Sequence, residues 1–155
     1  FMTPAIDQLT RLGVHHSVHE YTHTAKVASY GKEASDKLGV PPQRVFKTLV
    51  VDAGNKTLAV AVLPVDQQLN LKLMATAIGA KKVVMANPAT VNRSSGYVLG
   101  GVSPVGQKRA LTTIIDQRAK DYSSIYVSGG RRGLEVELAA GDLAMVTHGL
   151  FEIIS

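Results

Sequence analysis

The sequence predicts an α+β fold: a single domain in which a mixed, partly barrel-like β-sheet is flanked by short helices. Three observations support it. The 155 residues fit one compact domain, and 45% hydrophobic residues supply a core. The predicted strands alternate with helices early in the chain but cluster late in it. We therefore expect residues 2–155 to form one domain, and we treat Phe1, which precedes Met2, as a cloning remnant.

The first part of the chain contains clear helix boundaries. Thr3 is a good N-cap, Pro4 suits the first helical position and Gly13 suits a helix end, so these residues predict a short amphipathic helix. The chain is then predicted to be extended over 15–23. A second helix is predicted over about 29–38, because a glycine and a proline pair follow it.

The centre of the chain predicts a β-hairpin. The β-branched and apolar runs Val45–Asp52 and Thr57–Leu63 are joined by the turn residues 53–56. The remaining predicted elements are a helix from Asn70 to Ile78, a strand over Lys82–Ala86, a helix from Asn87 to about Arg93, strands over Thr112–Asp116, Ser124–Ser128 and Leu134–Leu138, and a helix over Gly141–Thr147.

Composition excludes several functional classes. Cysteine is absent, so the chain has no disulfide, no thiolate metal site and no thiol nucleophile. No apolar run approaches the roughly 20 residues of a membrane span, and no secretory leader pattern is present, so we expect a cytoplasmic protein with no membrane partner. The 17 Lys and Arg exceed the 12 Asp and Glu, giving a net charge of +5. This charge permits a polyanionic partner, although many mildly basic proteins have none.

Lys47 is the most informative single residue. It lies within an apolar run and, because side chains alternate along a strand, it shares a face with Val45, Leu49 and Val51. A lysine there must reach the strand end, meet an anion or line a cavity. Lining a cavity, it would act strongly on an anion or a polarised carbonyl, so Lys47 is either a site residue or a snorkelling lysine.

Two glycine-rich loops, 100–106 and 128–133, are each expected to follow a strand and could bring backbone N–H groups close to a ligand. Neither matches a P-loop or a dinucleotide fingerprint, and each could equally be a tight turn. Lys108, Arg109, Arg131 and Arg132 adjoin these loops. They form either a polyanion-binding rim or an ordinary solvated one.

Histidine and serine chemistry has weaker support. His15 and His19 would lie about 13 Å apart along a strand, too far to share a metal ion, so we expect no metal and no cofactor. Tyr21, on the same strand face, could pack its ring while its hydroxyl contacts a ligand. Ser103 and Ser128 adjoin glycines but lie in no Gly-x-Ser-x-Gly elbow, which disfavours a serine hydrolase.

Five stretches, ordered along nearly the whole chain, carry a family resemblance. They are 2–7 (MTPAID), 46–49 (FKTL), 79–83 (GAKKV), 96–108 (GYVLGGVSPVGQK) and 125–130 (IYVSGG). Together they resemble the YbaK family of trans-acting aminoacyl-tRNA editing proteins. The resemblance implies a deacylase that clears cysteine from mischarged tRNA(Pro), with prolyl-tRNA synthetase as a partner. Such editing is needed because a binding pocket discriminates poorly between amino acids of similar size.

The resemblance also implies the site residues. The catalytic set is Lys47, Tyr21, Gly100 and Ser128, and the substrate-binding set is Thr48, Gly101, Ser103, Gly129, Arg131 and Arg132. In the mechanism that the family implies, the substrate's own thiol attacks its ester carbonyl. The reaction releases a cyclic thiolactone and free tRNA. Backbone N–H groups near Gly100 and Gly101 are expected to receive the developing negative charge.

The sequence departs from the family pattern in two places and leaves two alternatives. Arg131 stands where lysine is common, and Ala110 interrupts the basic run, which affects the expected RNA contacts more than the pocket. The alanine-clearing branch of the family carries a His-Pro pair in its late strand region. This chain has no such pair, which favours the cysteine-clearing branch. The alternatives are a deacylase for another small amino acid such as alanine on tRNA(Pro), and a non-catalytic tRNA- or synthetase-binding module.

Overall fold

The computed structural model describes residues 3–24 and 29–155. Phe1, Met2 and residues 25–28 lie outside this description, and with them the first residue of the 2–7 stretch. The helices are α1 (Pro4–Arg11), α2 (Tyr30–Leu38), α3 (Leu71–Ile78), α4 (Pro88–Ser95) and α5 (Ala140–Thr147), with short 3₁₀ turns η1 (Pro42–Arg44) and η2 (Gln117–Asp121). The strands are β1 (Ser17–Glu20), β2 (Phe46–Asp52), β3 (Leu58–Pro64), β4 (Val84–Met85), β5 (Thr112–Asp116), β6 (Ile125–Ser128), β7 (Leu134–Leu138) and β8 (Leu150–Glu152).

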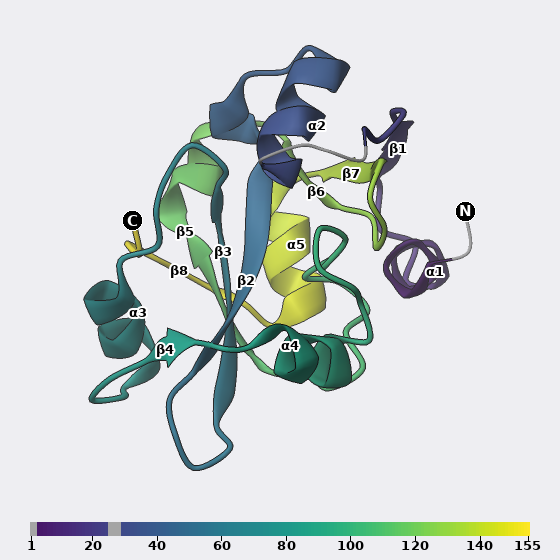
Figure 1. Cartoon of the computed structure of the whole chain (residues 1–155). Coiled ribbons are helices and arrows are strands. Elements are labelled where there is room, and N and C mark those ends of the chain that lie inside the picture. Colours follow the sequence, from purple (N-terminus) through teal and green to yellow (C-terminus); the bar gives the residue numbers. More distant parts are fainter. Residues whose placement is uncertain (1–2, 25–28) are drawn as a thin grey trace.

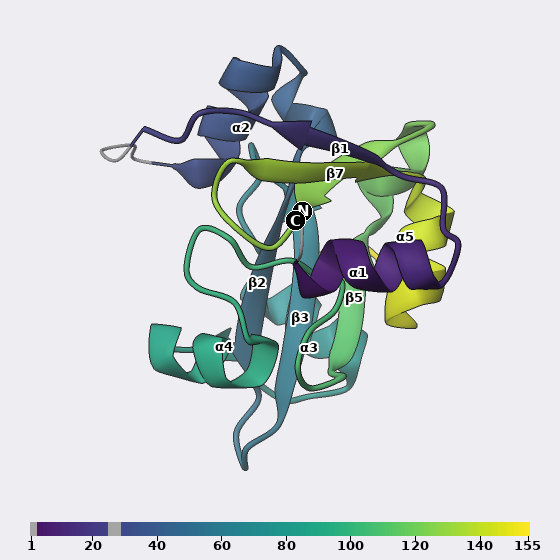
Figure 2. The same ribbon diagram turned by 90° about the vertical axis from the view of Figure 1, so that its right-hand side faces the viewer.

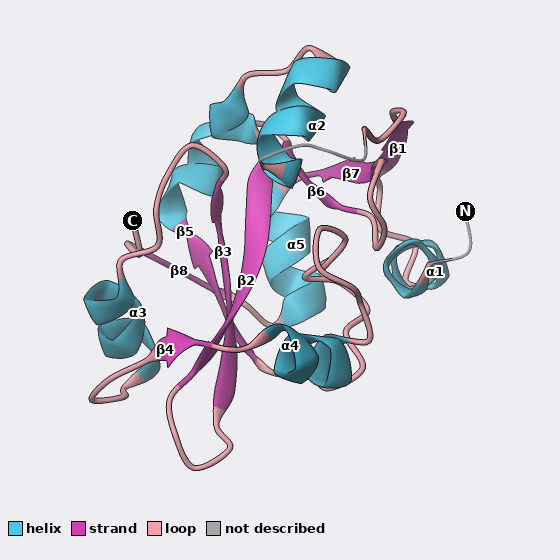
Figure 3. Cartoon of the chain, in the orientation of Figure 1, coloured by secondary structure: helices cyan, strands magenta, loops and turns pink. Residues whose placement is uncertain are grey.

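The strands form two sheets. The larger has the order β4-β2-β3-β5-β8 and is mixed, because β3–β5 and β5–β8 are parallel while β2 pairs antiparallel with β3 and β4. The smaller, β1-β7-β6, is antiparallel. Figure 3 shows both sheets with helices around them. The expected single-domain α+β fold with a mixed sheet is confirmed, although the described strands do not close into a barrel.

Helices cover both faces of the larger sheet. Figure 1 shows α3 on one side of β2 and β3 and α5 on the other. On the α3 side Met74 packs with Leu63, and on the α5 side Leu143 belongs to a core cluster with Val62. The cluster on the α5 side also contains Leu9 of α1, the helix at the front of Figure 2. Because both faces are covered, β3 is apolar along its whole length, as expected for a central strand.

Local signals set the helix ends as the sequence predicts. Thr3 Oγ1 accepts a hydrogen bond from Ile6 N and caps α1, and Asn70 Oδ1 accepts from Leu73 N and caps α3. Gly39 adopts a left-handed φ of 68° at the end of α2. The strand predicted over Lys82–Ala86 is shorter than expected, because only Val84 and Met85 pair with β2.

Among the described helices, none combines the length and apolar character needed to cross a bilayer.

Candidate active site

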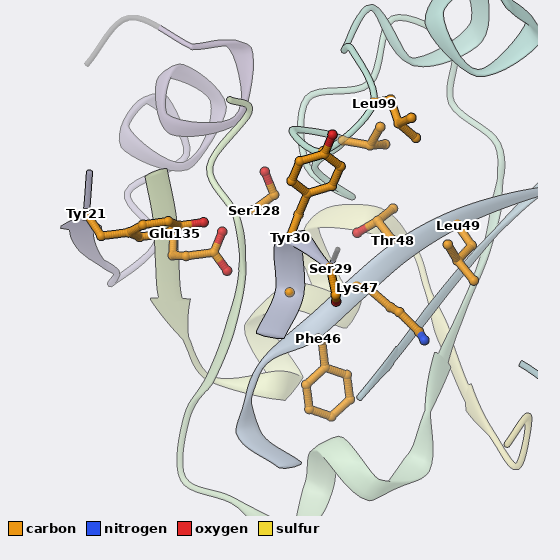
Figure 4. A pocket seen from close by; sticks show the side chains of 13 residues that line it. Tyr21, Ser29, Tyr30, Phe46, Lys47, Thr48, Leu49, Leu99, Ser128 and Glu135 are labelled. Carbon is orange, nitrogen blue, oxygen red and sulfur yellow. The ribbon is translucent and has the colours of Figure 1, made fainter. Parts of the chain in front are cut away.

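A cavity of about 280 Å³ opens beside β2, between the start of α2, the glycine-rich loop after α4, and strands β6 and β7 (Figure 4). All four residues expected to be catalytic line it: Lys47 and Tyr21, Gly100 of the loop, and Ser128 at the end of β6. They come from four separate segments of the chain. The fold therefore brings together the residues that the resemblance singles out.

Glycine is required at position 100. Its φ is +87°, and a Cβ there would lie 2.6 Å from Arg132 Nε and 2.9 Å from the Tyr30 ring. Any side chain would strain the turn and push Arg132 and Tyr30 apart. The loop backbone therefore packs closely against Arg132 and Tyr30 where Gly100 lines the cavity.

The expected substrate-binding residues divide into two groups. Thr48 lines the cavity, whereas Gly101, Ser103 and Gly129 are not among the residues that line it. Ser103 is fully buried and its Oγ accepts a hydrogen bond from Val105 N at 3.2 Å. Gly129 N–H donates to Leu134 O at 2.8 Å. These residues shape the loops and do not face the cavity.

The backbone N–H of Gly101 is not available for the oxyanion site expected in this region. Its N–H donates to Val98 O at 2.9 Å and closes a turn. Since that donor is engaged, Gly101 cannot receive negative charge from a ligand as the sequence suggested. Gly101 must nevertheless be small, because a Cβ there would lie 2.7 Å from Arg131 Cα.

The two arginines behave differently. The Arg132 guanidinium donates to Leu99 O through Nε at 3.1 Å and Nη2 at 2.9 Å, and it stacks 4.6 Å above the Tyr30 ring. Arg132 thus ties the loop to α2 at the rim of the cavity. Arg131 instead pairs with Glu20 at 3.1 Å on the exposed edge of β1. Neither arginine lines the cavity itself.

The basic pair after the loop lies apart from the cavity. Lys108 N donates to Ser95 O and Arg109 N donates to Ser94 O, which fixes both residues against the end of α4. Arg109 lines a separate hollow near α1 and α5. Lys108 and Arg109 therefore do not share the cavity rim with Arg132.

Lys47 lies on the face of β2 that sequence alternation predicts. Figure 4 shows its side chain pointing away from Ser128 and Glu135, on the same side of the strand as Leu49. The lysine is partly buried, and burial lowers the pKa of its amine, while the nearby carboxylate of Asp66 acts in the opposite direction. A cation held in this way, at one edge of a cavity, is available to an anionic ligand group.

Glu135 of β7 is the main site residue that sequence reasoning missed. Only 7% of its surface is exposed, it lines the cavity, and burial raises the pKa of its carboxyl to about 8. Burial and then the charge of Glu135 raise the pKa of Tyr21 to about 12. The alternation of side chains along the strand could have indicated this residue. Leu134 and Val136 belong to the core, so Glu135 between them lies on the opposite face.

Tyr30 is a second lining residue that the sequence did not indicate. Its ring lies under Arg132 and 5.8 Å from the ring of His23, measured between centroids. His23 in turn bonds to Glu33 of α2 at 2.7 Å. This chain of contacts connects the rim of the cavity with α2.

Glu33 fastens the segment after Tyr21 to α2. Its carboxylate accepts hydrogen bonds from His23 Nδ1 and from Thr24 N at 2.8 Å, and pairs with Lys37 Nζ at 3.2 Å. Burial alone would raise the pKa of Glu33, but these three partners outweigh it and lower the pKa to about 2.

Metal binding has no geometric support in the part of the chain that the structure describes, because no three His, Asp or Glu side chains are grouped to hold an ion. His19, considered as a candidate ligand, bonds to Glu137 at 2.9 Å instead.

The fold and the cavity have counterparts among known structures and sequences. The chain superimposes over its whole length on 99% of a solved chain described as a candidate trans-editing enzyme for prolyl tRNA synthetase, with a TM-score of 0.86 and 22% identity. At that identity the likeness shows a shared α+β fold. A model of the aminoacyl-tRNA editing domain matches residues 24–145.

The chain therefore belongs to the aminoacyl-tRNA editing domain family, as its YbaK-like stretches predicted. It is 42% identical over 121 residues to EbsC of Enterococcus faecalis, named as a candidate Cys-tRNA(Pro)/Cys-tRNA(Cys) deacylase. The match covers 77% of this chain and 73% of EbsC. This chain is also 28% identical to a proline–tRNA ligase of Fervidobacterium nodosum over 109 residues. That match covers 70% of this chain but only 18% of the ligase.

Proposed function

We propose that this chain is an aminoacyl-tRNA deacylase that removes cysteine from mischarged tRNA(Pro). The observation that carries the proposal is the meeting of Lys47, Tyr21, Gly100 and Ser128 around one cavity, in a family of editing domains and in a chain that has no cysteine of its own. The name of EbsC, a relative at 42% identity, points to the same substrate. A cytoplasmic location, a tRNA(Pro) 3′ end as ligand and prolyl-tRNA synthetase as partner are parts of this proposal.

The reaction needs no nucleophile from the protein. The cysteine thiol of the substrate gives up its proton, and the thiolate attacks its own ester carbonyl carbon. The bond between that carbon and the ribose oxygen then breaks, and the ribose oxygen takes up a proton. The products are a cysteine thiolactone, which water later hydrolyses, and tRNA with a free 3′ hydroxyl. A thiol with a pKa of about 8.5 ionises far more readily near neutral pH than a serine hydroxyl, so chemistry as well as size selects cysteine.

Glu135 is suited to carry the proton in this reaction. Its pKa of about 8 lies close to that of a thiol, and proton transfer is most efficient between groups of matched pKa. Its ionised form accepts the thiol proton, and the resulting carboxylic acid gives a proton to the leaving ribose oxygen. Tyr21 lies beside it, and Ser128 is its partner in the pairing of β6 with β7; these two residues hold the aminoacyl and ribose groups.

Lys47 anchors the anionic end of the substrate in this proposal. Its amine points away from Ser128 and Glu135, so it is placed to bind a phosphate of the tRNA 3′ end and not to transfer a proton. Thr48 contacts the aminoacyl group, while Arg132, with its ion-paired neighbour Arg131, belongs to the rim over which the tRNA passes. Residues 2–155 act as one domain.

A panel of mischarged tRNAs tests the proposal. Cysteine, alanine and proline esters of tRNA(Pro) are incubated with the protein, with and without prolyl-tRNA synthetase. Hydrolysis of the cysteine ester alone supports the proposal. Preferential hydrolysis of the alanine ester would establish the alternative small-amino-acid deacylase, and hydrolysis of none of them would leave a tRNA- or synthetase-binding module.

A variant of Lys47 tests the site within the same panel. Lys47→Ala is expected to lower kcat/KM for cysteinyl-tRNA(Pro) at least 100-fold, mainly through KM, and Lys47→Arg is expected to recover part of the loss because it keeps the charge. Undiminished hydrolysis by Lys47→Ala would remove Lys47 from the site.

A further inference from the structure

The outer edge of β2 is unpaired beside the cavity. In the antiparallel pair of β2 and β3, Val65 N donates to Val45 O and Ala53 N donates to Thr57 O. Both bonds use odd-numbered residues on the β2 side, and the register runs without a bulge between them. Because residues of an antiparallel strand alternate between the two edges, the even-numbered residues of β2 direct their N–H and C=O groups away from β3.

Neighbouring elements cover the two ends of that outer edge but not its middle. Val50 O accepts a hydrogen bond from Ala86 N next to β4, and Val45 forms an isolated bridge with Tyr126 of β6. Between these points lies Thr48. Among the described residues no group pairs with the Thr48 N–H or C=O.

The Thr48 side chain is unsatisfied as well. Its Oγ1 is buried and has no hydrogen-bond partner in the described chain. Figure 4 shows this hydroxyl pointing to the side of β2 where Tyr30 and Ser128 lie. One residue thus has a backbone donor, a backbone acceptor and a hydroxyl without partners beside a cavity. Buried polar groups are rarely left without partners unless a ligand supplies them.

We propose that the aminoacyl group of the substrate pairs with Thr48 as if it were a residue of an added antiparallel strand. Two residues opposite each other in such a pair exchange both of their backbone hydrogen bonds. An aminoacyl ester carries the same two groups, an α-ammonium and a carbonyl. Its α-ammonium donates to Thr48 O, and its carbonyl oxygen accepts from Thr48 N–H.

This pairing has a catalytic consequence. Negative charge grows on the ester carbonyl oxygen when the thiolate attacks, and a preformed N–H donor stabilises that charge. Thr48 Oγ1–H adds a second donor on the same side. Thr48 thereby supplies the oxyanion-binding groups that the engaged N–H of Gly101 cannot. Paired residues also place their side chains on one face of a sheet, so the substrate thiol lies on the cavity side with Ser128 and Glu135.

The inference rests on the proposed function, and a substrate series tests it first. Cysteinyl-tRNA(Pro) is compared with tRNA(Pro) esterified to 3-sulfanylpropanoate, which keeps the thiol and carbonyl but lacks the α-amino group. Each enzymatic rate is divided by the spontaneous hydrolysis rate of that ester. We expect kcat/KM of the wild type to fall at least 30-fold for the deamino ester. Values within threefold of each other would overturn the pairing.

Variants test the hydroxyl donor. Thr48→Val keeps the shape and the backbone but removes the hydroxyl, and it is expected to lower kcat 10- to 100-fold with KM changed less than threefold. Thr48→Ser restores the hydroxyl and is expected to recover kcat to within threefold of the wild type. Thr113→Val is the matched control, since Thr113 lies in β5 of the same sheet, outside the cavity, with its hydroxyl bonded to Leu111 O. Equal kcat for Thr48→Val and wild type would overturn the assignment of this donor.

Amide spectra observe the backbone donor directly. The probe is 3′-cysteinylamino-3′-deoxyadenosine, a non-hydrolysable amide analogue of the aminoacyl end. On binding, the Thr48 amide signal is expected to shift downfield and its hydrogen exchange to slow at least tenfold. Binding without either change would overturn the pairing. Failure of the wild type to deacylate cysteinyl-tRNA(Pro) would instead refute the proposed function, so the two failures are distinguishable.

Discussion

Two buried glutamates in this molecule have opposite environments. Glu33 on α2 is 5% exposed and its carboxylate has three partners, His23, Thr24 N–H and Lys37, so its pKa is lowered to about 2. Glu135 on β7 is 7% exposed and no side chain or N–H of the described chain bonds to its carboxyl, so burial raises its pKa to about 8. Both residues have little exposed surface, but the Glu135 carboxyl is the more deeply desolvated of the two and has no partner, so desolvation sets its pKa while the partners set that of Glu33.

The difference in environment indicates a structural role for Glu33 and a catalytic role for Glu135. The carboxylate of Glu33 is fully satisfied within the protein and fixes the segment after Tyr21 to α2. The carboxyl of Glu135 lines a cavity that Thr48 of β2 also lines, and the buried Thr48 Oγ1 has no hydrogen-bond partner in the described chain. Buried polar groups without partners lower stability, and they are retained where a ligand completes them. We therefore infer that the contacts of Glu33 stabilise the fold and that Glu135 takes part in the reaction.

Of the changes that test this comparison, Glu135→Gln has the largest expected effect, a loss of activity. The amide cannot accept a proton, so kcat/KM for cysteinyl-tRNA(Pro) should fall about 100-fold, in the range of general-base catalysis. In the wild type kcat/KM should rise with pH through about 8, the pKa of Glu135, whereas in the variant only the ionisation of the substrate thiol, with a pKa of about 8.5, should raise it. Glu137→Gln on the same strand is the control, since Glu137 bonds to Ser124 outside the cavity. Full activity of Glu135→Gln would assign the proton transfer elsewhere.

Glu33→Gln should have the next largest effect, and on stability. The amide has no charge and only one acceptor oxygen for His23, Thr24 N–H and Lys37, and the expected loss in the free energy of unfolding is about 2–3 kcal/mol. Denaturant unfolding at pH 7 measures it. Below the melting transition, deacylation should stay within about threefold of the wild type. A variant as stable as the wild type would contradict the structural role of Glu33.

The two glutamates should also give opposite pH dependences of stability. Glu33 has a folded pKa below its ordinary value of 4.5, so its contribution is present above pH 4.5 and is lost as the pH falls toward 2. Glu135 has a folded pKa above 4.5, so its contribution is full below pH 4.5 and is lost as the pH rises toward 8. Glu135→Gln should therefore be more stable than the wild type at pH 9, by about 1–2 kcal/mol, and equally stable at pH 4. If Glu135→Gln melted at a lower temperature than the wild type at pH 9, ionised Glu135 would not destabilise the fold, and its raised pKa would be contradicted.

The smallest expected effect is that of Lys37→Ala. The Lys37 side chain is 33% exposed, so solvent screens its ion pair with Glu33, although it also donates to Thr22 O and Thr24 Oγ1. We expect a loss of about 0.5–1 kcal/mol in the free energy of unfolding, reduced further in 1 M salt. A loss as large as that of Glu33→Gln would mean that Lys37, and not the whole cluster, holds the segment.

Most of the fold could be predicted from the sequence, because its boundaries depend on local chemistry. Thr3 and Asn70 cap helices, and Gly39 and Gly79 end them, wherever the rest of the chain lies. The strand β8 was not predicted. Its three residues, Leu150–Glu152, form a strand only because β5 lies alongside, and such pairing is a property of tertiary structure.

The candidate site was predictable only in part, and for a physical reason. Lys47 stands out because a charge interrupts an apolar strand, and the family resemblance supplies Tyr21, Gly100 and Ser128. The burial of the Glu135 carboxyl and the missing partner of Thr48 Oγ1 cannot be read from sequence, since both depend on what the fold places around each group. The same holds for Gly101, whose N–H is engaged within its own turn.

The most direct test of this account is an NMR titration of the glutamate carboxyls, labelled with ¹³C, in the free protein and with 3′-cysteinylamino-3′-deoxyadenosine bound. Glu33→Gln and Glu135→Gln assign the two signals. The account predicts that Glu135 titrates near pH 8 in the free protein and shifts when the analogue binds, while Glu33 titrates near pH 2 in both states. A Glu135 signal that titrates near its ordinary value of 4.5 and does not respond to the bound analogue would contradict it.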